Sequence, residues 1–553
     1  MSDWNQLLPS QHADTFSRER LPAAADLPHF LDAGLDYPDT LNCAVALLDE
    51  HVAAGHGDRI ALRGSHDIND HAQAFAWTYA ELKAHSDRIA QVLSLELGLR
   101  SGERLLLRGG NSPMMAACWL GAVKAGLVVV PTMPLLRAPE LRAIIDKAEV
   151  HAALCEQSLL PDLQACADPE HPQHAPGLRT IVAFKTDAAD GLEARMAAHD
   201  GHFTPPPTSR DDVCLIAFTS GTTGQPKGTM HFHRDVLAMC DLFPRHVLNM
   251  GPHDVVCGTP PLAFTFGLGG LLAFPLRHGA SSVLLEKHTP ETLLQCIETH
   301  GVTQCYTAPT MYRQMAGMAA EHDLSSLKHP VSAGEALPAA TRALWEQATG
   351  HVITDGIGGT EVIHIYIASA GAQVRAGRLG QVVPGYVAQI VDEDMRPVPP
   401  GTVGRLAVRG PTGCKYLADA RQSQYVQNGW NLPGDTFSVD EDGYFAYQAR
   451  NDDMIISAGY NIAGPEVESA LMTHPAVLEC GVIGVPDEAR GQIVKAFVVL
   501  RPGHAASDDL IDALQTHVKQ EIAPFKYPRD IAFIEALPRT ETGKLQRFKL
   551  RQL

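Results

Sequence analysis

The sequence has no C-x-x-C pair, and its eleven cysteines are an odd number scattered along 553 residues. That pattern excludes a disulfide framework, and the spacing does not suit a zinc site. The sequence also lacks a basic excess, because 44 Lys and Arg stand against 63 Asp and Glu, a net charge of −19. Nucleic acids and anionic membranes attract basic surfaces, so neither is an expected partner.

Long apolar runs are missing as well. The most apolar stretch, residues 126–136, is about half of the ~20 residues that a membrane-spanning helix needs, and prolines interrupt it. The N-terminal segment mixes acids and bases and lacks the apolar core of a signal peptide. We therefore expect a soluble, cytoplasmic protein with reduced cysteines.

The hydrophobic residues, 45% of the chain, are enough to exclude wholesale disorder. Short apolar runs alternate with amphipathic stretches, a pattern typical of layered α/β folds. We predict strands at 104–108, 127–130, 213–218, 282–285, 302–306 and 351–354, and a helix at 114–124. The proline-rich segment 204–212 is expected to be a surface loop.

The texture of the sequence changes after about residue 387, where short strand patterns alternate with turn residues such as Val398-Pro-Pro-Gly401. We predict an α/β fold whose large N-terminal domain, 1–450, contains layered α/β subdomains and a β subdomain at about 387–450. Residues 451–553 are predicted to form a small α+β domain. Its strands are expected at 454–457, 476–485, 493–500 and 531–535, and its helices at 465–473 and 507–521.

The strongest local signal is the segment FTSGTTGQPKG at residues 218–228, which follows an apolar strand. Its glycines permit close backbone approach, and five side chains can donate hydrogen bonds to anionic oxygens: Thr219, Ser220, Thr222, Thr223 and Lys227. The spacing differs from that of a Walker A loop. A strand followed by such a loop favours a phosphate-binding site, and the alternative is a flexible surface loop.

Further motifs follow in order along the chain: TYAEL at 78–82, KAG at 124–126, AGE at 333–335, DGIGGTE at 355–361, GRLG at 377–380, GD at 434–435 and PRTETGK at 538–544. Together with the loop at 218–228, they resemble the motifs of the ANL superfamily of adenylate-forming enzymes. This superfamily includes acyl- and aryl-CoA synthetases, peptide-synthetase adenylation domains and firefly-type luciferases. The resemblance covers nearly the whole chain.

The resemblance implies that ATP, Mg²⁺ and CoA take part in the reaction. Lys544 is the implied catalytic lysine, Thr360 contacts the α-phosphate, and Glu361 binds Mg²⁺. The implied ATP and AMP contacts are Thr219, Ser220, Gly221, Thr222, Thr223, Gly224, Lys227, Gly334, Glu335, Asp355, Gly356, Asp435 and Arg450. Adenylation brings two anions together, so a cation at the reacting centre and a metal ion on the phosphates make chemical sense.

Local sequence alone leaves alternatives open for three of these residues. Lys544 is also compatible with a solvated tail lysine, Glu361 with a helix N-terminal acid and Asp435 with a turn residue.

The segment Arg450-Asn-Asp452 resembles the family hinge, about which a mobile C-terminal domain swings at Asp452. An ordinary surface turn is the alternative. Gly459 matches the glycine that lines the tunnel for CoA. Ala458 and Pro433 depart from the family pattern, which bears on the width of that tunnel and on a minor phosphate or ribose contact.

The acyl substrate is suggested by two segments, DGIGGTEVIH at 355–364 and MHFHRD at 230–235. Both resemble benzoate-type ligases, and the segment at 230–235 is most similar to 2-aminobenzoate–CoA ligases. The implied acyl pocket consists of Phe264, Phe266, Tyr306, Ala333, Gly358 and His364, because glycines admit a flat ring and aromatic side chains face it. Core packing is the alternative for the two phenylalanines.

Histidine side chains commonly bind metal ions, and three histidines are candidates for that role: His231, His233 and His364. No third ligand falls at metal spacing around them, which favours structural or carboxylate-contacting roles.

We therefore predict an ATP-dependent aryl-CoA ligase that acts on small-molecule substrates, as a monomer or a homodimer. Its aromatic carboxylate, of the benzoate or 2-aminobenzoate type, becomes an acyl-adenylate and is then transferred to CoA. The alternatives are a stand-alone adenylation enzyme that loads a carrier protein, a medium-chain acyl-CoA synthetase, a luciferase-like oxygenase and a nucleotide sensor without catalysis. Nothing in the sequence suggests the luciferin-type acid that an oxygenase needs, and a sensor would be expected to lack Lys544 or Glu361.

Overall fold

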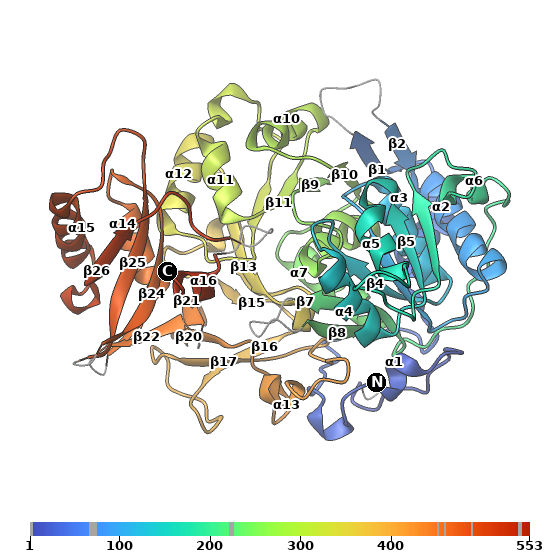
Figure 1. Ribbon diagram of the computed structural model, residues 1–553, viewed down its shortest axis with the longest axis horizontal. Helices are drawn as coiled ribbons and strands as arrows, with labels where there is room; N and C mark the ends of the chain where they lie inside the picture. The colour runs from blue at the N-terminus through green and yellow to red at the C-terminus, as the bar shows by residue number, and fades with distance from the viewer. Residues whose placement is uncertain are drawn as a thin grey trace.

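The computed structural model describes residues 4–65, 75–219, 226–450, 453–457, 460–487, 490–539 and 545–553. Within these ranges four β-sheets organise the chain, and helices cover the sheets of the N-terminal part (Figure 1). No helix among these residues combines the length and the apolar character needed to cross a bilayer.

A six-stranded sheet has the order β6-β5-β3-β4-β7-β8 and is parallel except for the antiparallel pair β7–β8. Every residue of β3 and β4 is buried, as expected for strands covered on both faces. The bounds are β3 Arg104–Arg108, β4 Val128–Thr132, β5 Ala152–Glu156, β6 Thr180–Phe184, β7 Val213–Thr219 and β8 Lys227–Phe232.

A nine-stranded sheet has the order β15-β14-β13-β12-β11-β9-β10-β1-β2. Its central strands are parallel, and β2, β14 and β15 add antiparallel edges. The bounds are β1 Ile60–Ser65, β2 Phe75–Thr78, β9 Val255–Gly258, β10 Ser281–Leu285, β11 Gln304–Thr307, β12 His329–Ser332, β13 Thr354–Gly358, β14 Ile365–Ser369 and β15 Gln381–Val382.

The helices of this part start at residues that suit a first turn. Thr78 caps α2 in a capping box with Glu81, and Ser112 caps α3, whose first residue is Pro113. The bounds are α1 Phe16–Glu19, α2 Tyr79–Gln91, α3 Pro113–Lys124, α4 Ala138–Ala148, α5 Leu160–Ala167, α6 Leu192–Met196, α7 His233–His246, α8 Thr265–Leu268, α9 Phe274–Arg277, α10 Pro290–His300, α11 Pro309–Ala316, α12 Ala339–Thr349 and α13 Gln422–Tyr425.

The β subdomain is a six-stranded antiparallel sheet in which β18-β19-β17-β20-β21 are hydrogen-bonded in that order and β16 pairs with β17. The bounds are β16 Val387–Val391, β17 Gly404–Arg409, β18 Val426–Gln427, β19 Trp430–Asn431, β20 Asp435–Val439 and β21 Phe445–Arg450. The change of texture near residue 387 therefore coincides with the first strand of this sheet.

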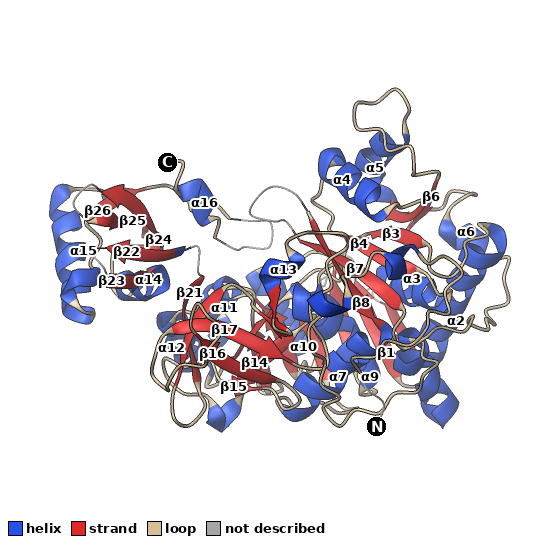
Figure 2. Ribbon diagram, turned by 90° about the horizontal axis from the view of Figure 1, so that it is seen from below, coloured by secondary structure: helices blue, strands red, loops and turns tan. Residues whose placement is uncertain are grey.

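The C-terminal unit has its own core, in which Val467 and Leu471 of α14 pack with residues such as Val482 and Val518. In Figure 2 its strands and helices form a separate group, and α14 touches α12 and β21 of the N-terminal part. The bounds are β22 Met454–Ser457, β23 Tyr460–Ala463, α14 Gly464–Met472, β24 Val477–Asp487, β25 Gly491–Leu500, α15 Asp508–Glu521, β26 Asp530–Phe533 and α16 Arg547–Leu550.

The predicted layered α/β fold with a small α+β C-terminal unit is confirmed, and most predicted elements lie within a few residues of the observed ones. The strand predicted at 351–354 is wrong: the strand begins at Thr354 and continues to Gly358, because pairing with β12 and β14 outweighs the low strand propensity of that segment.

The segment 204–212 is irregular, as predicted, but its second half is not at the surface. Residues 208–212 are buried beneath the N-terminal segment, where the backbone N–H of Leu8 and the hydroxyl of Ser10 donate to Asp211 and Asp212. The prolines predicted the irregular backbone of this segment, but they contain no information about the N-terminal segment that covers it.

Candidate functional site

The carboxyl ends of neighbouring parallel strands bring several predicted site residues to one edge of the nine-stranded sheet. Tyr306 lies in β11, Ala333 to Glu335 follow β12, and Asp355 to Gly358 belong to β13, which pairs with β12 through Ser332 and Asp355. Ligands of α/β proteins bind at this end of the strands. Strand β8, which pairs with β7, reaches the residues after β13 through His231, whose Nε2 lies 2.8 Å from the Thr360 carbonyl oxygen.

Thr219 and Lys227 mark the two ends of the FTSGTTG loop. They are paired across the antiparallel strands β7 and β8. Ser220, Gly221, Thr222, Thr223 and Gly224 lie outside the described residues. The ammonium nitrogen of Lys227 lies 5.3 Å from the centre of the Tyr416 ring, within the range of a cation–π contact.

The turn at residues 360–363 carries the predicted Thr360 and Glu361. It begins as a 3₁₀ turn, Thr360–Val362, and ends at Ile363, whose φ of 70° is unusual for a β-branched residue. Such a conformation costs on the order of 1–3 kcal/mol and persists only where the surroundings enforce it.

Side chains from distant parts of the sequence enforce this turn. The Thr412 hydroxyl donates to the Val362 carbonyl oxygen at 2.8 Å, and the Tyr416 hydroxyl donates to Oε1 of Glu361 at 2.6 Å. His231 Nε2 lies 2.8 Å from the Thr360 carbonyl oxygen, and because a carbonyl only accepts, Nε2 carries the proton.

His231 belongs to a fully buried ionic network with Asp235 and Lys415. The Asp235 carboxylate accepts from Lys415 Nζ at 2.8 Å and from the backbone N–H of Phe232 at 3.0 Å, which also starts helix α7. Burial acts to raise the pKa of Asp235, but Lys415 and His231 outweigh it and hold the pKa far below its usual range. Burial lowers the pKa of His231.

Gly334 and Glu335 follow β12, and Gly334 adopts a φ of 94°, which favours glycine. Glu335 accepts a hydrogen bond from the Thr310 hydroxyl at 2.8 Å and pairs with Arg539 of the C-terminal unit at 3.5 Å. Arg539 also pairs with Glu479 at 2.6 Å. The segment 333–335, which is predicted to contact ATP, is therefore in direct contact with the C-terminal unit.

Asp355 and Gly356 are buried, whereas Thr360 and Glu361 of the turn are half-buried. Burial raises the pKa of Asp355 to about 7, although Arg342 at 4.0 Å acts in the opposite direction. A side chain on Gly356 would collide with that of Ile365, at 2.8 Å from the added carbon.

Asp435 begins β20 and pairs with Arg450 of β21, so this predicted nucleotide contact and the predicted end of the N-terminal domain are neighbours. The side chain of Arg450 lies outside the described part of the structure, as do Asp452, Gly459 and Lys544. Their predicted roles in the hinge, the CoA tunnel and catalysis remain predictions.

Three of the predicted acyl-pocket residues form an aromatic cluster. Phe266 meets Tyr306 edge-on at 6.0 Å between ring centres and His364 at 5.6 Å. Ala333 is buried, Gly358 is exposed, and the backbone of Gly358 lies so close to His364 that an added carbon would be 2.5 Å from its carbonyl oxygen. Phe264 is half-buried and caps helix α8 without a ring contact to the cluster.

His364 sits in an apolar cage. Its ring contacts Phe243, Phe266 and Phe274, and neither ring nitrogen has a hydrogen-bond partner of good geometry among the described residues. Burial lowers the pKa of His364 to about 3, so its imidazole is neutral at physiological pH. Gly269 faces the ring so closely that an added carbon would be 2.5 Å from His364 Cδ2.

His233 has potential metal ligands beside it that sequence spacing did not reveal. Cys43, Cys214 and His233 are buried, and their ligand atoms lie within 4.8 Å of one another. The backbone N–H of Cys43 donates to His233 Nδ1 at 3.1 Å, so the lone pair that would face a metal ion is already used. We assign this group to core packing.

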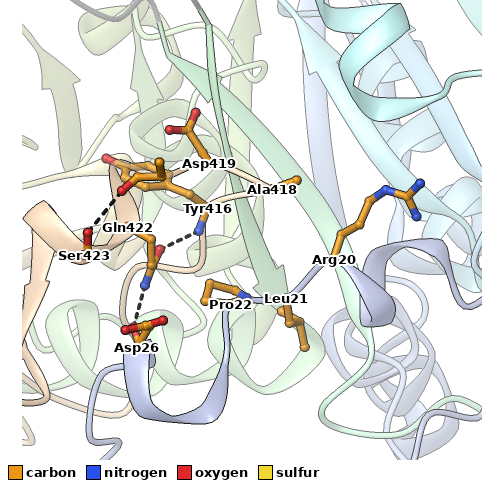
Figure 3. A pocket seen from close by; sticks show the side chains of 10 residues that line it. Arg20, Leu21, Pro22, Asp26, Tyr416, Ala418, Asp419, Gln422 and Ser423 are labelled. Atoms are coloured by element: carbon orange, nitrogen blue, oxygen red, sulfur yellow. Dashed lines mark hydrogen bonds between the residues drawn. The ribbon is translucent and has the colours of Figure 1, made fainter.

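An open pocket of about 280 Å³ lies between the N-terminal segment and residues 416–423 (Figure 3). Gln422 accepts a hydrogen bond from the backbone N–H of Tyr416 at 2.9 Å and donates to the carbonyl oxygen of Asp26 at 2.9 Å. This pocket contains none of the predicted substrate residues. Gln422 in its wall fixes the backbone of Tyr416.

The donor set at the turn fits Mg²⁺. Glu361 supplies a half-buried carboxylate, a hard oxygen ligand of the kind that Mg²⁺ prefers, and Thr360 stands beside it. Within the described residues the carboxylate takes one hydrogen bond, from Tyr416 at Oε1, which leaves Oε2 for a cation.

Comparisons with known proteins match both parts of the chain. The profile of a family described as AMP-binding enzyme matches residues 49–416, and that of the AMP-binding enzyme C-terminal domain matches residues 466–544. A benzoate–CoA ligase of Thauera aromatica is 35% identical over 523 residues, which cover 93% of this chain and 96% of the relative.

Two solved structures share the fold over most of their length. The anthranilate CoA ligase AuaEII in complex with anthranoyl-AMP has a TM-score of 0.87 at 33% identity and covers 94% of this chain and 98% of its own. A benzoate CoA ligase from Burkholderia xenovorans LB400 has a TM-score of 0.81 at 30% identity and covers 92% of this chain and 100% of its own.

Proposed function

Because the chain belongs to the AMP-binding enzyme family, we propose that it is an ATP-dependent aryl-CoA ligase for a carboxylate of the benzoate or 2-aminobenzoate type. The observation that carries the proposal is the aromatic cluster of Phe266, Tyr306 and His364, which lies directly beside the Thr360–Glu361 turn. The likeness to ligases of benzoate and anthranilate supports the same substrate class.

The nucleotide would bind between the loop and the turn. Thr219, Lys227 and the loop between them would hold the phosphates, and Glu335 and Asp435 would contact adenine and ribose. Glu361 would hold Mg²⁺ with Thr360 beside it, and the ion would supply charge neutralisation on the phosphates. In this assignment Lys544 approaches from the C-terminal domain, which begins at about residue 451 and turns about Asp452.

The chemistry follows from these positions. A carboxylate oxygen attacks the α-phosphorus of ATP, the bond to the bridging oxygen breaks, and pyrophosphate leaves with that electron pair. The CoA sulfur then attacks the acyl carbon, loses its proton and expels AMP. The cationic groups of Lys227 and Lys544 stabilise the charge that develops in the first step.

His364 and the phenylalanines around it would bind the ring of the acid. A neutral imidazole in an apolar cage adds no charge to the pocket, so an uncharged aromatic ring suits the cluster better than an ammonium or a second carboxylate.

The decisive experiment is pyrophosphate release from ATP against a panel of benzoate, hydroxybenzoates, aminobenzoates, hexanoate and amino acids, with and without CoA. We expect turnover with the aromatic acids and formation of free aryl-CoA. Turnover with hexanoate or amino acids alone would overturn the substrate class. Adenylation without any aryl-CoA would favour the carrier-protein alternative.

Lys544 offers a second test of the same mechanism. The Lys544→Ala variant should lose far more of the adenylation rate than of the rate of thioester formation from supplied acyl-adenylate. Equal losses in the two half-reactions would contradict the assigned role.

A cytoplasmic location is supported by the cysteines, all eleven of which are free and buried. The oligomeric state, monomer or homodimer, is open to measurement by light scattering.

A further inference from the structure

The residue that connects the phosphate loop to the metal-binding turn is Tyr416, which belongs to neither motif. Its hydroxyl donates to Oε1 of Glu361 at 2.6 Å, and its ring lies 5.3 Å from Lys227 Nζ. Lys227 and Glu361 are 134 positions apart in the sequence, and one side chain touches both.

The position of Tyr416 is fixed by its backbone as well as by its ring. Residues 415–417 run alongside β8: the N–H of Met230 donates to the Lys415 carbonyl oxygen at 2.8 Å, and the N–H of Leu417 donates to the Gly228 carbonyl oxygen at 2.8 Å. The N–H of Tyr416 donates to Gln422 (Figure 3), and Tyr425 packs edge-on at 5.8 Å between ring centres. The hydroxyl is therefore delivered to Glu361 by a rigid frame.

The Tyr416 hydroxyl is the donor in this hydrogen bond, because a carboxylate oxygen only accepts. A hydrogen bond to a charged acceptor is stronger than one between neutral groups and restricts the carboxylate to one orientation. With Oε1 held in this way, Oε2 is the oxygen that can face a cation.

We propose that Tyr416 is a positioning residue, which presents Glu361 to Mg²⁺ and keeps the Lys227 ammonium on the same nucleotide. The inference rests on the proposed nucleotide site, although it does not depend on which acid the enzyme activates. It extends the site to a segment, 412–417, that contributes no predicted substrate contact.

The Tyr416→Phe variant tests this directly, because it removes the hydroxyl and keeps the ring. Calorimetric titration with ATP in the absence of any carboxylic acid should show Mg·ATP binding weakened by roughly tenfold or more, as for a lost hydrogen bond to a charged group. Binding of ATP in EDTA should change by less than about twofold, because the ring contact to Lys227 remains. Equal weakening with and without Mg²⁺, or no weakening, would overturn the inference.

Tyr312→Phe is the matched control. It removes another buried tyrosine hydroxyl, one that donates to the Cys305 carbonyl oxygen at 2.6 Å away from the turn. It should lower thermal stability and leave Mg·ATP affinity unchanged. If Tyr312→Phe weakened Mg·ATP binding as much as Tyr416→Phe, the effect would be a general loss of rigidity and the inference would be wrong.

A double-mutant cycle with Glu361→Gln completes the test. If Tyr416 acts through the Glu361 carboxylate, Tyr416→Phe should have little further effect on Mg·ATP binding in the Glu361→Gln background. Additive losses would contradict that route. Since no acid is present, these titrations keep their meaning even if the carboxylate panel gives no turnover.

Discussion

His231 and His364 are two buried histidines on either side of the same turn, and their surroundings are opposite. His231 donates to the Thr360 carbonyl oxygen and stands beside the ion pair of Asp235 and Lys415. His364 is enclosed by phenylalanines. Burial lowers the pKa of both, so the pKa alone does not distinguish them. The difference lies in what each ring touches: one fixes a backbone and the other shapes an apolar wall.

The largest expected effect comes from the ionic side of this comparison. Lys415→Met should lower the free energy of unfolding by about 3–5 kcal/mol, because it leaves Asp235 as a buried charge without its partner. Urea unfolding of the purified protein measures the change. Lys147→Met removes a lysine that pairs with Asp419 at 2.7 Å nearer the surface, and it should cost no more than about 1 kcal/mol. Equal losses of unfolding free energy in the two variants would show that the buried ion pair stabilises the protein no more than the more exposed one.

His231→Phe should come next. It leaves the Thr360 carbonyl oxygen without its donor, at a cost of about 1–3 kcal/mol in unfolding free energy, and it should reduce the rate of pyrophosphate release. His231→Gln retains an N–H donor and should recover part of both losses. A Gln variant no better than the Phe variant would argue against the hydrogen bond as the cause.

Gly269→Ala tests the packing around His364. The added methyl group would lie 2.5 Å from the imidazole, and we expect a loss of about 1–3 kcal/mol in unfolding free energy with a higher KM for the aromatic acid. His364→Ala in the same chain should relieve the collision. Gly251→Ala is the control, because no atom lies within 4 Å of a carbon added there. If the Gly269→Ala, His364→Ala double variant were as unstable as Gly269→Ala alone, a collision with His364 would not be the cause of the loss.

The smallest expected effect is a change in pH dependence. Between pH 6.5 and about 3 the unfolded chain protonates His364 while the folded protein excludes that proton, so stability falls as pH decreases, by about 1.4 kcal/mol per unit. His364→Phe should therefore reduce the stability difference between pH 7.5 and pH 5.5 by about 1.4 kcal/mol in urea unfolding. Burial also lowers the pKa of His12, to about 4, so part of the dependence remains in the variant. An unchanged difference would refute the assignment.

Local sequence patterns were sufficient to predict an element where the residues of that one segment determine its conformation. The strand predicted at 104–108 has the same bounds as β3. A strand covered on both faces does not need alternating apolar and polar residues, so its apolar run was a clear pattern. The motif at 355–361 drew attention to Thr360 and Glu361, and the structure has both in one 3₁₀ turn. The strand at β13 was misplaced because Thr354–Gly358 is a weak strand former that neighbouring strands hold in place.

The contacts that hold the site residues in place could not be predicted from the sequence, for a physical reason. Lys415 is 180 positions from Asp235, and Tyr416 is 55 positions from Glu361. Such contacts depend on the register between β8 and residues 415–417, which no local pattern specifies. Cys43 and His233 were separated in the same way, so spacing rules for metal ligands could not bring them together.

Arg539 has a consequence for the proposed rotation of the C-terminal unit. It lies between a carboxylate on each part, 2.6 Å from Glu479 of its own unit and 3.5 Å from Glu335 across the boundary. A rotation of the C-terminal unit would carry Glu479 along with the guanidinium and stretch only the longer of the two pairs. In the rotation proposed above, Arg539 would therefore remain paired with Glu479, while its contact with Glu335 would open.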